Sequence, residues 1–468
     1  MYFILINSAI MAQDFYGILN NIMDQPALTR LSLADLQQTK LELSSAYVYQ
    51  DYYRVSTSGI GTQSLVGDVT GVSLYAVNAG SSFKYGILSH IQDRSTSYSN
   101  LNADIPVNTD YQHTDRDFAL QMAFGNDRIL WGMGIDQQST LVTAPIRISK
   151  YPESEDPLMS RYFLDWLEPS FGNELDAQGE FNLTSLQTFT SLPLGNHLTL
   201  DINYSISDNA FVPYLDYTNT SNIDELRGDR RLAFNGTNAN QLLEIGLESS
   251  QWLAKPTLAI QKTIADMIIE NPLPKGIIDD FPELGGLDFS RKGGALSLEG
   301  KLHGLNLEAG IGYSQWEADA KLTTPVLGRF WFFPIAHAAQ LQISGKSISQ
   351  HLNLHTELFN RGIRVDLNAG YQHAYFDFTV VGEAELEFNI HSVPIDALYQ
   401  FHLHVISIGI PASYTFNSFT LHYEIKQMIP WFKRVDNSEL SFQDDDYQLE
   451  REVRGGGQHM IILSYILR

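Results

Sequence analysis

Strict alternation of apolar and polar residues from His351 to His373 is the feature that most restricts what this chain can fold into. This period of two is typical of a β-strand whose two faces meet different surroundings. Folding the segment about a two-residue turn at Asn360-Arg361 predicts a hairpin with an apolar face and a polar face. The predicted cross-strand pairs are Leu358–Ile363, Thr356–Val365, Leu354–Leu367, Leu352–Ala369, Glu357–Arg364, His355–Asp366 and Asn353–Asn368. A soluble sheet and a membrane barrel can both contain such a hairpin. The pattern in the rest of the chain is needed to distinguish these two folds.

The same alternation returns along the chain from Lys40 onward, in segments of about ten residues. Counting these segments predicts about 18 strands, with 14 to 16 as alternatives. The count includes a turn at Gly345-Lys346 and a separate strand over Ala384–Ile390. Short turns are predicted near residues 79, 126, 195, 254, 303, 345 and 417. Long loops are predicted at 93–115, 138–177, 208–240, 264–292, 315–336 and 429–457. All these short turns fall on one rim of the sheet and the long loops on the other, and the Asn360-Arg361 turn is a short connection on the long-loop rim.

The composition restricts how this chain could meet a membrane or another partner. No stretch reaches the ~18 consecutive apolar residues of a membrane-spanning helix. Aromatic residues make up 12% of the chain, cysteine is absent, and the net charge is −24. The missing cysteines exclude disulfides and thiolate metal sites, and the negative charge argues against nucleic acid as a partner.

Short turns on one rim, long loops on the other, and strands with one apolar face are together typical of transmembrane β-barrels. From Lys40 to its end the sequence resembles bacterial outer-membrane β-barrels. The resemblance implies an all-β fold, a transmembrane antiparallel up-and-down barrel, in the outer membrane of a Gram-negative cell. The segment Asp24-Gln-Pro-Ala-Leu28 resembles the Asn-Pro-Ala element of FadL-like fatty-acid transporters, with Gln in place of Asn. The chain ends Tyr465-Ile-Leu-Arg468, whereas many outer-membrane barrels end in an aromatic residue.

The chain divides into three predicted parts. Residues 1–12 are apolar and precede an acceptable cleavage site, so they are interpreted as the remnant of a signal peptide; a buried first strand is the alternative. Residues 13–39 are expected to form a periplasmic or plug segment. Residues 40–468 are expected to form the barrel as a single domain.

The polar face of the opening hairpin supplies the candidate functional residues. Side chains on the inner face of a barrel line its lumen. The predicted lumen-lining residues are Asn353, His355, Glu357, Arg364, Asp366 and Asn368. The pair His355–Asp366 has the composition of a general base, but the sequence has no nucleophile motif beside it. The chain is therefore expected not to be an enzyme, and ion pairs bracing the wall explain the same residues.

Metal sites and cofactors are not predicted. His402 and His404 share one strand face and could begin a metal site, but spacing fixes no third ligand. Apolar residues also change from odd to even positions here, so a β-bulge is predicted near residue 405. The acidic residues Glu153, Glu155 and Asp156, and the run Asp444–Asp446, could bind Ca²⁺. They lack the spacing of an EF-hand loop, so they are interpreted as solvated loops.

A barrel of about 18 strands has an interior too wide for side chains alone to fill. The leading functional hypothesis is therefore a channel or transporter for a small solute or a hydrophobic ligand. The alternative is a structural or binding protein whose long acidic outer loops dock a protein partner. A third hypothesis, a soluble all-β propeller or stacked sheet, would show an internal repeat, and none is apparent. The expected partners are outer-membrane lipid and either a small solute or a protein at the cell surface.

Overall fold

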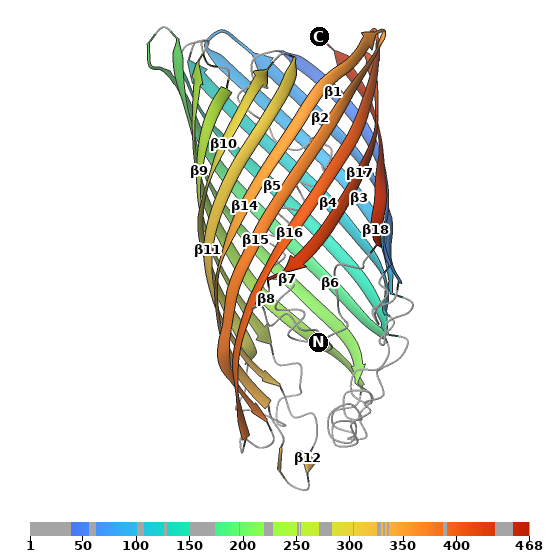
Figure 1. The fold of residues 1–468 in the computed structure, drawn as a ribbon, viewed down its shortest axis with the longest axis vertical. Coiled ribbons are helices and arrows are strands. Elements are labelled where there is room, and N and C mark those ends of the chain that lie inside the picture. The colour runs from blue at the N-terminus through green and yellow to red at the C-terminus, as the bar shows by residue number, and fades with distance from the viewer. Residues whose placement is uncertain are drawn as a thin grey trace.

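The computed structural model is a closed antiparallel β-barrel (Figure 1). It describes residues 39–55, 62–100, 107–125, 129–148, 174–195, 197–219, 228–249, 252, 254–270, 283–302, 304–324, 329–330, 333–334, 337–386, 391–435 and 453–467. Several predictions fall on residues outside this range. They are the signal-peptide remnant at 1–12, most of the periplasmic or plug segment at 13–39, and the acidic loop residues Glu153–Asp156 and Asp444–Asp446. Within it, no helix has the length and apolar character needed to cross a bilayer.

Sixteen of the described strands form the barrel, and β12 and β13 pair only with each other. This confirms the predicted fold, and sixteen is one of the counts given as alternatives to about 18. The strands are β1 Lys40–Val55, β2 Thr62–Ala79, β3 Phe83–Asn100, β4 Val107–Gly125, β5 Leu130–Ile148, β6 Glu174–Pro193, β7 Leu198–Asn219, β8 Gly228–Ser249, β9 Ala254–Glu270, β10 Glu283–Leu302, β11 Leu305–Thr324, β12 Arg329–Phe330, β13 Phe333–Pro334, β14 His337–Arg361, β15 Ile363–Leu386, β16 His391–Phe416, β17 Phe419–Arg434 and β18 Val453–Leu467.

The first and last strands close the barrel against each other. β1 pairs with β18 in a register that places Leu41 opposite Leu467, so the described chain starts and ends on one rim. The tight connections at 80–82, between Leu302 and Leu305, and at 417–418 lie on this same rim, which is uppermost in Figure 1. Because outer-membrane barrels have short periplasmic turns, this rim is the periplasmic one and the opposite rim faces outward.

The predicted turn at Gly345-Lys346 does not exist, because β14 runs without a break through both residues. Gly345 faces inward, where a side chain would come within 2.6 Å of Cβ of Phe378 and Cζ2 of Trp316. The glycine therefore makes room for two rings rather than for a turn. Likewise, Ala384 belongs to β15 and does not begin a separate strand. When these two errors are removed, the predicted number of strands falls from about 18 to sixteen. The turn between β14 and β15 then lies on the short-turn rim.

The opening hairpin is real, but its register differs from the predicted one. The turn is centred on Gly362, which has a positive φ of 87°, and not on Asn360-Arg361. A bulge between Glu357 and Phe359 follows, and Leu354 then pairs with Ala369 instead of Leu367. Beyond the bulge the shift along the ladder is two residues, so the side chains from Leu352 to Glu357 keep the predicted face. On the turn side of the bulge the shift is three residues, and Phe359 lies opposite Val365 on the outer face.

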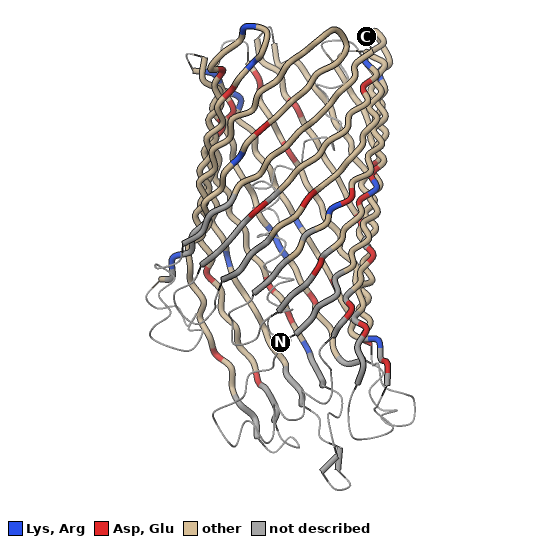
Figure 2. The backbone as a smooth tube through the Cα atoms, turned by 90° about the vertical axis from the view of Figure 1, so that its right-hand side faces the viewer, with Lys and Arg blue, Asp and Glu red and all other residues tan. Residues whose placement is uncertain are grey.

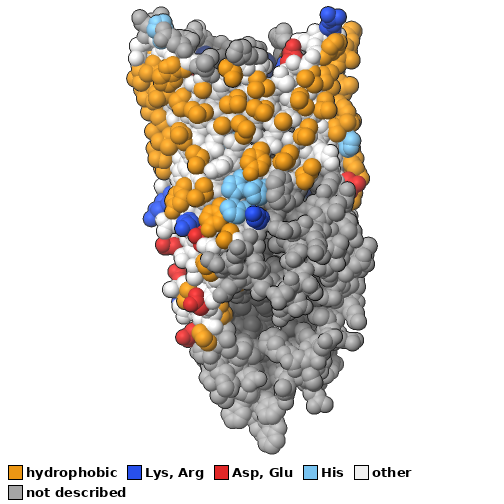
Figure 3. Space-filling view, in the orientation of Figure 1, with side chains coloured by type: hydrophobic (Ala, Val, Ile, Leu, Met, Phe, Trp, Pro, Cys, Tyr) orange, Lys and Arg blue, Asp and Glu red, His pale blue; other side chains and the backbone are white. Residues whose placement is uncertain are grey.

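Exposed apolar side chains gather on the outer surface of the periplasmic half of the barrel, as the face in Figure 3 shows. On β16, for example, Ile406, Ile408 and Ile410 face outward and are 39%, 50% and 48% exposed. This surface, called the apolar belt below, has the character that a lipid environment requires.

The strands continue well past the belt toward the long-connection rim. β16 has 26 residues, whereas a strand needs only about 9–11 to cross a bilayer. Beyond the belt the outward residues of β14 are polar, as at Gln340, Gln342 and Lys346. Much of the predicted loop sequence at 93–115, 208–240 and 315–336 is in fact strand, because polar outward residues hide the alternation from which strands were recognised.

Candidate solute pathway in the barrel lumen

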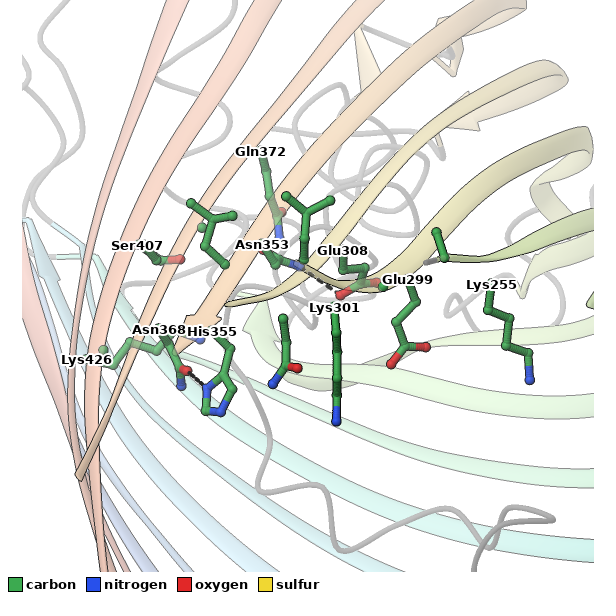
Figure 4. Close-up of a pocket in the computed structure, with 18 of the residues that line it drawn as sticks. Lys255, Glu299, Lys301, Glu308, Asn353, His355, Asn368, Gln372, Ser407 and Lys426 are labelled. Atoms are coloured by element: carbon green, nitrogen blue, oxygen red, sulfur yellow. Dashed lines mark hydrogen bonds between the residues drawn. The ribbon is translucent and has the colours of Figure 1, made fainter. Parts of the chain in front are cut away.

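A polar cavity of about 780 Å³ lies inside the periplasmic half of the barrel (Figure 4). Residues of β8, β9, β10, β11, β14, β15, β16 and β17 form its wall, together with Trp252. The labelled side chains Glu299, Lys301 and His355 point to the same side of this wall. Charged residues occur along the strands at the height of the belt (Figure 2), and those that face inward give the lumen its polarity.

The cavity wall carries both signs of charge. Lys255 lies 3.0 Å from Asp201 and 3.5 Å from Glu248. Glu308 lies 3.4 Å from His351 and accepts a hydrogen bond of 3.1 Å from Asn353. These contacts hold carboxylates and cations at fixed positions along the wall, so a polar group of a passing solute would meet donors and acceptors in turn.

Three of the predicted lumen residues, Asn353, His355 and Asn368, line this cavity. His355 Nδ1 lies 2.6 Å from Oδ1 of Asn368, which is its cross-strand neighbour. His355 also remains 4.0 Å from Asp366, although the register no longer makes these residues direct partners.

The other three predicted lumen residues lie closer to the periplasmic rim. Arg364 contacts Asp366 at 2.9 Å and Glu357 at 3.5 Å. The expected Glu357–Arg364 contact therefore exists, although Cα of Arg364 faces Asn360. A role for these six residues in transport remains a prediction.

An apolar wall lines the outward half of the lumen, beyond the polar cavity. Its buried side chains come from six neighbouring strands, and the rings of Phe376 and Phe401 stack with centroids 4.9 Å apart. The members are Phe289, Trp316, Ala318, Ala320, Leu341, Ile343, Ala374, Phe376, Phe378, Val380, Phe401, Leu403, Val405 and Met428. All face inward, so on these strands the apolar residues change from the outer face to the inner face at the edge of the belt.

A second cavity of about 270 Å³ joins the two environments. Ala374, Leu403 and Val405 of the apolar wall line one part of it. Glu308 and Asn353, which also line the polar cavity, form another part. The inner wall therefore changes continuously from apolar to polar along β14, β15 and β16.

The opposite wall, on β3, β4 and β5, is polar at its inner face. Asp115 is buried, lies 2.6 Å from Nε2 of His113, and accepts a hydrogen bond of 2.5 Å from Thr140. His90 and Gln92 are also buried and lie 3.3 Å apart. The lumen thus has one apolar and one polar side in its outward half.

Sequence reasoning found the polar hairpin face but missed the apolar wall. The odd-numbered residues Phe401, Leu403 and Val405 were attributed to a β-bulge near residue 405, and this is wrong. The pairing of β16 with both neighbours is unbroken through Val405. The change of phase was the visible signal, and it reflects apolar side chains that turn into the lumen.

His402 and His404 lie on the outer surface and not in the lumen. The register places His373 of β15 directly opposite His404, so the fold brings three histidines together where the sequence showed two.

A closed sixteen-stranded barrel with an apolar outer belt, a polar inner face and short turns on one rim defines a class of protein, the outer-membrane β-barrels. The chain is a member of this class and is located in the outer membrane.

Comparisons of the sequence with protein-family models and with curated proteins give no match. Solved structures with similar folds include a Pseudomonas aeruginosa FadL homologue, with a TM-score of 0.40 at 10% identity over 92% of this chain and 90% of that one. The Pseudomonas putida toluene transporter TodX has a TM-score of 0.40 at 11% identity, over 94% and 93%. The ferric yersiniabactin uptake receptor FyuA from Yersinia pestis has a TM-score of 0.41 at 7% identity, over 92% and 80%. Similarity at this level does not assign a substrate.

Proposed function

We propose that this protein is an outer-membrane channel or transporter for a small hydrophobic or amphipathic solute. The observation that carries the proposal is the apolar wall, which lines the outward half of the lumen and continues into the polar cavity through Ala374, Leu403 and Val405. A solute entering from outside would first contact rings and aliphatic side chains, and then a wall of charged and amide groups.

The physical reason for this choice lies in what each environment contributes. Apolar contacts favour a hydrophobic solute by about 25 cal/mol for each Å² removed from water. The polar cavity further along the lumen offers a hydrophobic solute no such gain. A solute that leaves the apolar wall is therefore not held tightly in the cavity. A barrel of sixteen strands is also wide enough to leave an open interior. Toluene is a suitable first test solute, because it can stack on the rings of the wall and has no polar group for the cavity to bind.

The proposal is tested by measuring uptake into vesicles that contain the purified barrel. Labelled toluene is compared with labelled glucose at concentrations far below saturation. The test variant is Val405→Asn on the apolar wall, and the matched control is Val69→Asn, another buried and inward-facing valine, on β2. Each lost methyl-sized contact weakens binding by about 0.8 kcal/mol, so the two methyl groups of Val405 predict roughly a tenfold drop in toluene uptake.

The control variant is expected to keep toluene uptake close to that of the unaltered protein, since Val69 packs with Val48 and Met460 away from the apolar wall. Equal losses in both variants would show that the substitution damages the barrel in general. Uptake of toluene no faster than in protein-free vesicles, from a barrel shown to be folded, would refute the proposed function.

A further inference from the structure

Three histidines form a cluster on the outer surface of the barrel, at the edge of the apolar belt. His373 on β15 and His404 on β16 are direct cross-strand partners, and His402 lies two residues from His404 on the same face. One ring nitrogen from each lies within 4.8 Å of the other two. His373 Nε2 and His402 Nδ1 are only 2.8 Å apart. The three side chains are half-buried, so solvent reaches them.

Two histidines at positions i and i+2 of one strand, with a third opposite on the next strand, place three imidazoles side by side on one face. Three histidine ligands with an open fourth position are one of the arrangements in which proteins hold Zn²⁺. With Zn–N distances of about 2.0–2.1 Å, tetrahedral geometry separates ligand nitrogens by roughly 3.4 Å. The nitrogens of His373 and His402 are 2.8 Å apart, and no separation within the set exceeds 4.8 Å. The rings stack with their planes 17–23° apart, so the side chains would have to rotate to direct their nitrogens at one ion.

We propose that His373, His402 and His404 bind a divalent transition metal, with Zn²⁺ as the preferred ion. Imidazole nitrogen is a ligand suited to Zn²⁺, Cu²⁺ and Ni²⁺ and poorly suited to Mg²⁺ or Ca²⁺. The bound ion would cross-link β15 to β16 where the strands leave the membrane. Its fourth position would face the surroundings of the barrel and would accept water or a headgroup oxygen.

The neighbouring side chains affect the metal in opposite ways. The hydroxyl of Tyr371 lies 2.9 Å from Nδ1 of His404, which fixes the orientation of that ring and leaves Nε2 as the nitrogen to face the ion. Lys433 lies opposite His402 on β17, and its positive charge disfavours a cation at the site. Lys346, close by on β14, is neutralised by Asp377 at 3.1 Å. The positive charge of Lys433 is therefore expected to weaken the binding of a metal ion at this site.

The first experiment measures Zn²⁺ binding to the full chain in detergent, after a chelator wash, by competition with a chromophoric indicator. The test variants are His373→Gln and His404→Gln. The control is His459→Gln on β18, because His459 also faces outward and lies 3.0 Å from a tyrosine hydroxyl, that of Tyr423, but lies outside the cluster. Loss of an outer-shell partner of a metal ligand weakens binding by about 10–100-fold, so loss of a ligand is expected to weaken it at least tenfold. The control should leave the affinity unchanged.

Two further measurements separate a metal site from a merely basic surface patch. Co²⁺ bound by three histidines is expected to give the strong visible absorption of tetrahedral cobalt, and this signal should vanish in His404→Gln. The variant Lys433→Gln should bind Zn²⁺ more tightly, because it removes a like charge, whereas a site for anionic headgroups would bind its phosphate ligand less tightly.

Heat-modifiable migration on gels reports that each variant is folded. Zinc binding should raise the unfolding temperature of the unaltered protein, because a ligand that binds only the folded state stabilises it. Folded protein that binds Zn²⁺ no more tightly than His404→Gln does, or a cobalt spectrum that survives both histidine substitutions, would overturn the proposal.

Discussion

A lysine introduced at the middle of the apolar belt should destabilise the barrel far more than the same lysine beyond the belt. On β16 the outward apolar residues run from Ile406 to Phe416, ten residues further along the strand. At a rise of about 3.4 Å per residue and a tilt of about 40°, these ten steps span roughly 26 Å of height. This agrees with the apolar band of about 25 Å that is usual in outer-membrane barrels. Ile410 lies near its centre and is 48% exposed.

The free energy of unfolding is measured in lipid vesicles by guanidinium titration, with tryptophan fluorescence as the signal. Ile410→Lys is compared with Ile410→Ala, so that loss of the isoleucine contacts cancels. The lysine is expected to cost about 2–4 kcal/mol more than the alanine, which is the cost of a lysine at the bilayer midplane. Gln342→Lys, at an exposed outward position of β14 beyond the belt, should cost no more than about 1 kcal/mol. Equal costs at the two positions would refute the assignment of the belt to the periplasmic half of the barrel.

Three smaller predictions use the same unfolding assay. Gly345→Ala should cost about 1–3 kcal/mol, because the new Cβ overpacks Trp316 and Phe378; a neutral result would contradict the inward position of Gly345. Gly362→Ala should cost about 1–2 kcal/mol through its positive φ alone, since nothing lies within 4 Å of the added carbon. Arg364→Gln should cost less than about 1 kcal/mol, because the guanidinium is half exposed; a larger loss would mean that its carboxylate partners are desolvated.

The sequence predicted those parts of the fold that depend on the lipid-facing side chains. Leu352 and Leu354 keep their outward face in the structure, because the membrane demands apolar residues there whatever the register. The register itself was not predictable from that alternation, since a shift of two residues preserves both faces. Gly362, whose positive φ allows the turn, was the better indicator of its position, but Asn360-Arg361 also fits the composition of a two-residue loop.

The error at Gly345 has a different origin. A glycine followed by a polar residue is a common turn signal, and within a strand it can equally mark the close approach of another group. Only the partner rings decide between the two, and they come from β11 and β15, which are distant in sequence from Gly345. The third histidine was missed for the same reason, because the register of β15 against β16 brings His373 to His404. Sequence spacing within one strand contains no information on that register.

The apolar wall could have been recognised by comparing strands with one another. Taken alone, the change from Val405 to Ile406 on β16 is explained equally by a bulge or by a boundary between surroundings. On β15, however, the apolar residues also change phase, from Tyr371 on the outer face to Ala374 and Phe376 on the inner face. β11 does the same, from an exposed Tyr313 to a buried Trp316. A bulge changes the phase of one strand only, whereas every strand passes through the edge of the membrane. A change of phase shared by neighbouring strands therefore identifies the edge of the membrane, and it places the apolar residues beyond that edge inside the barrel, where a hydrophobic solute would meet them.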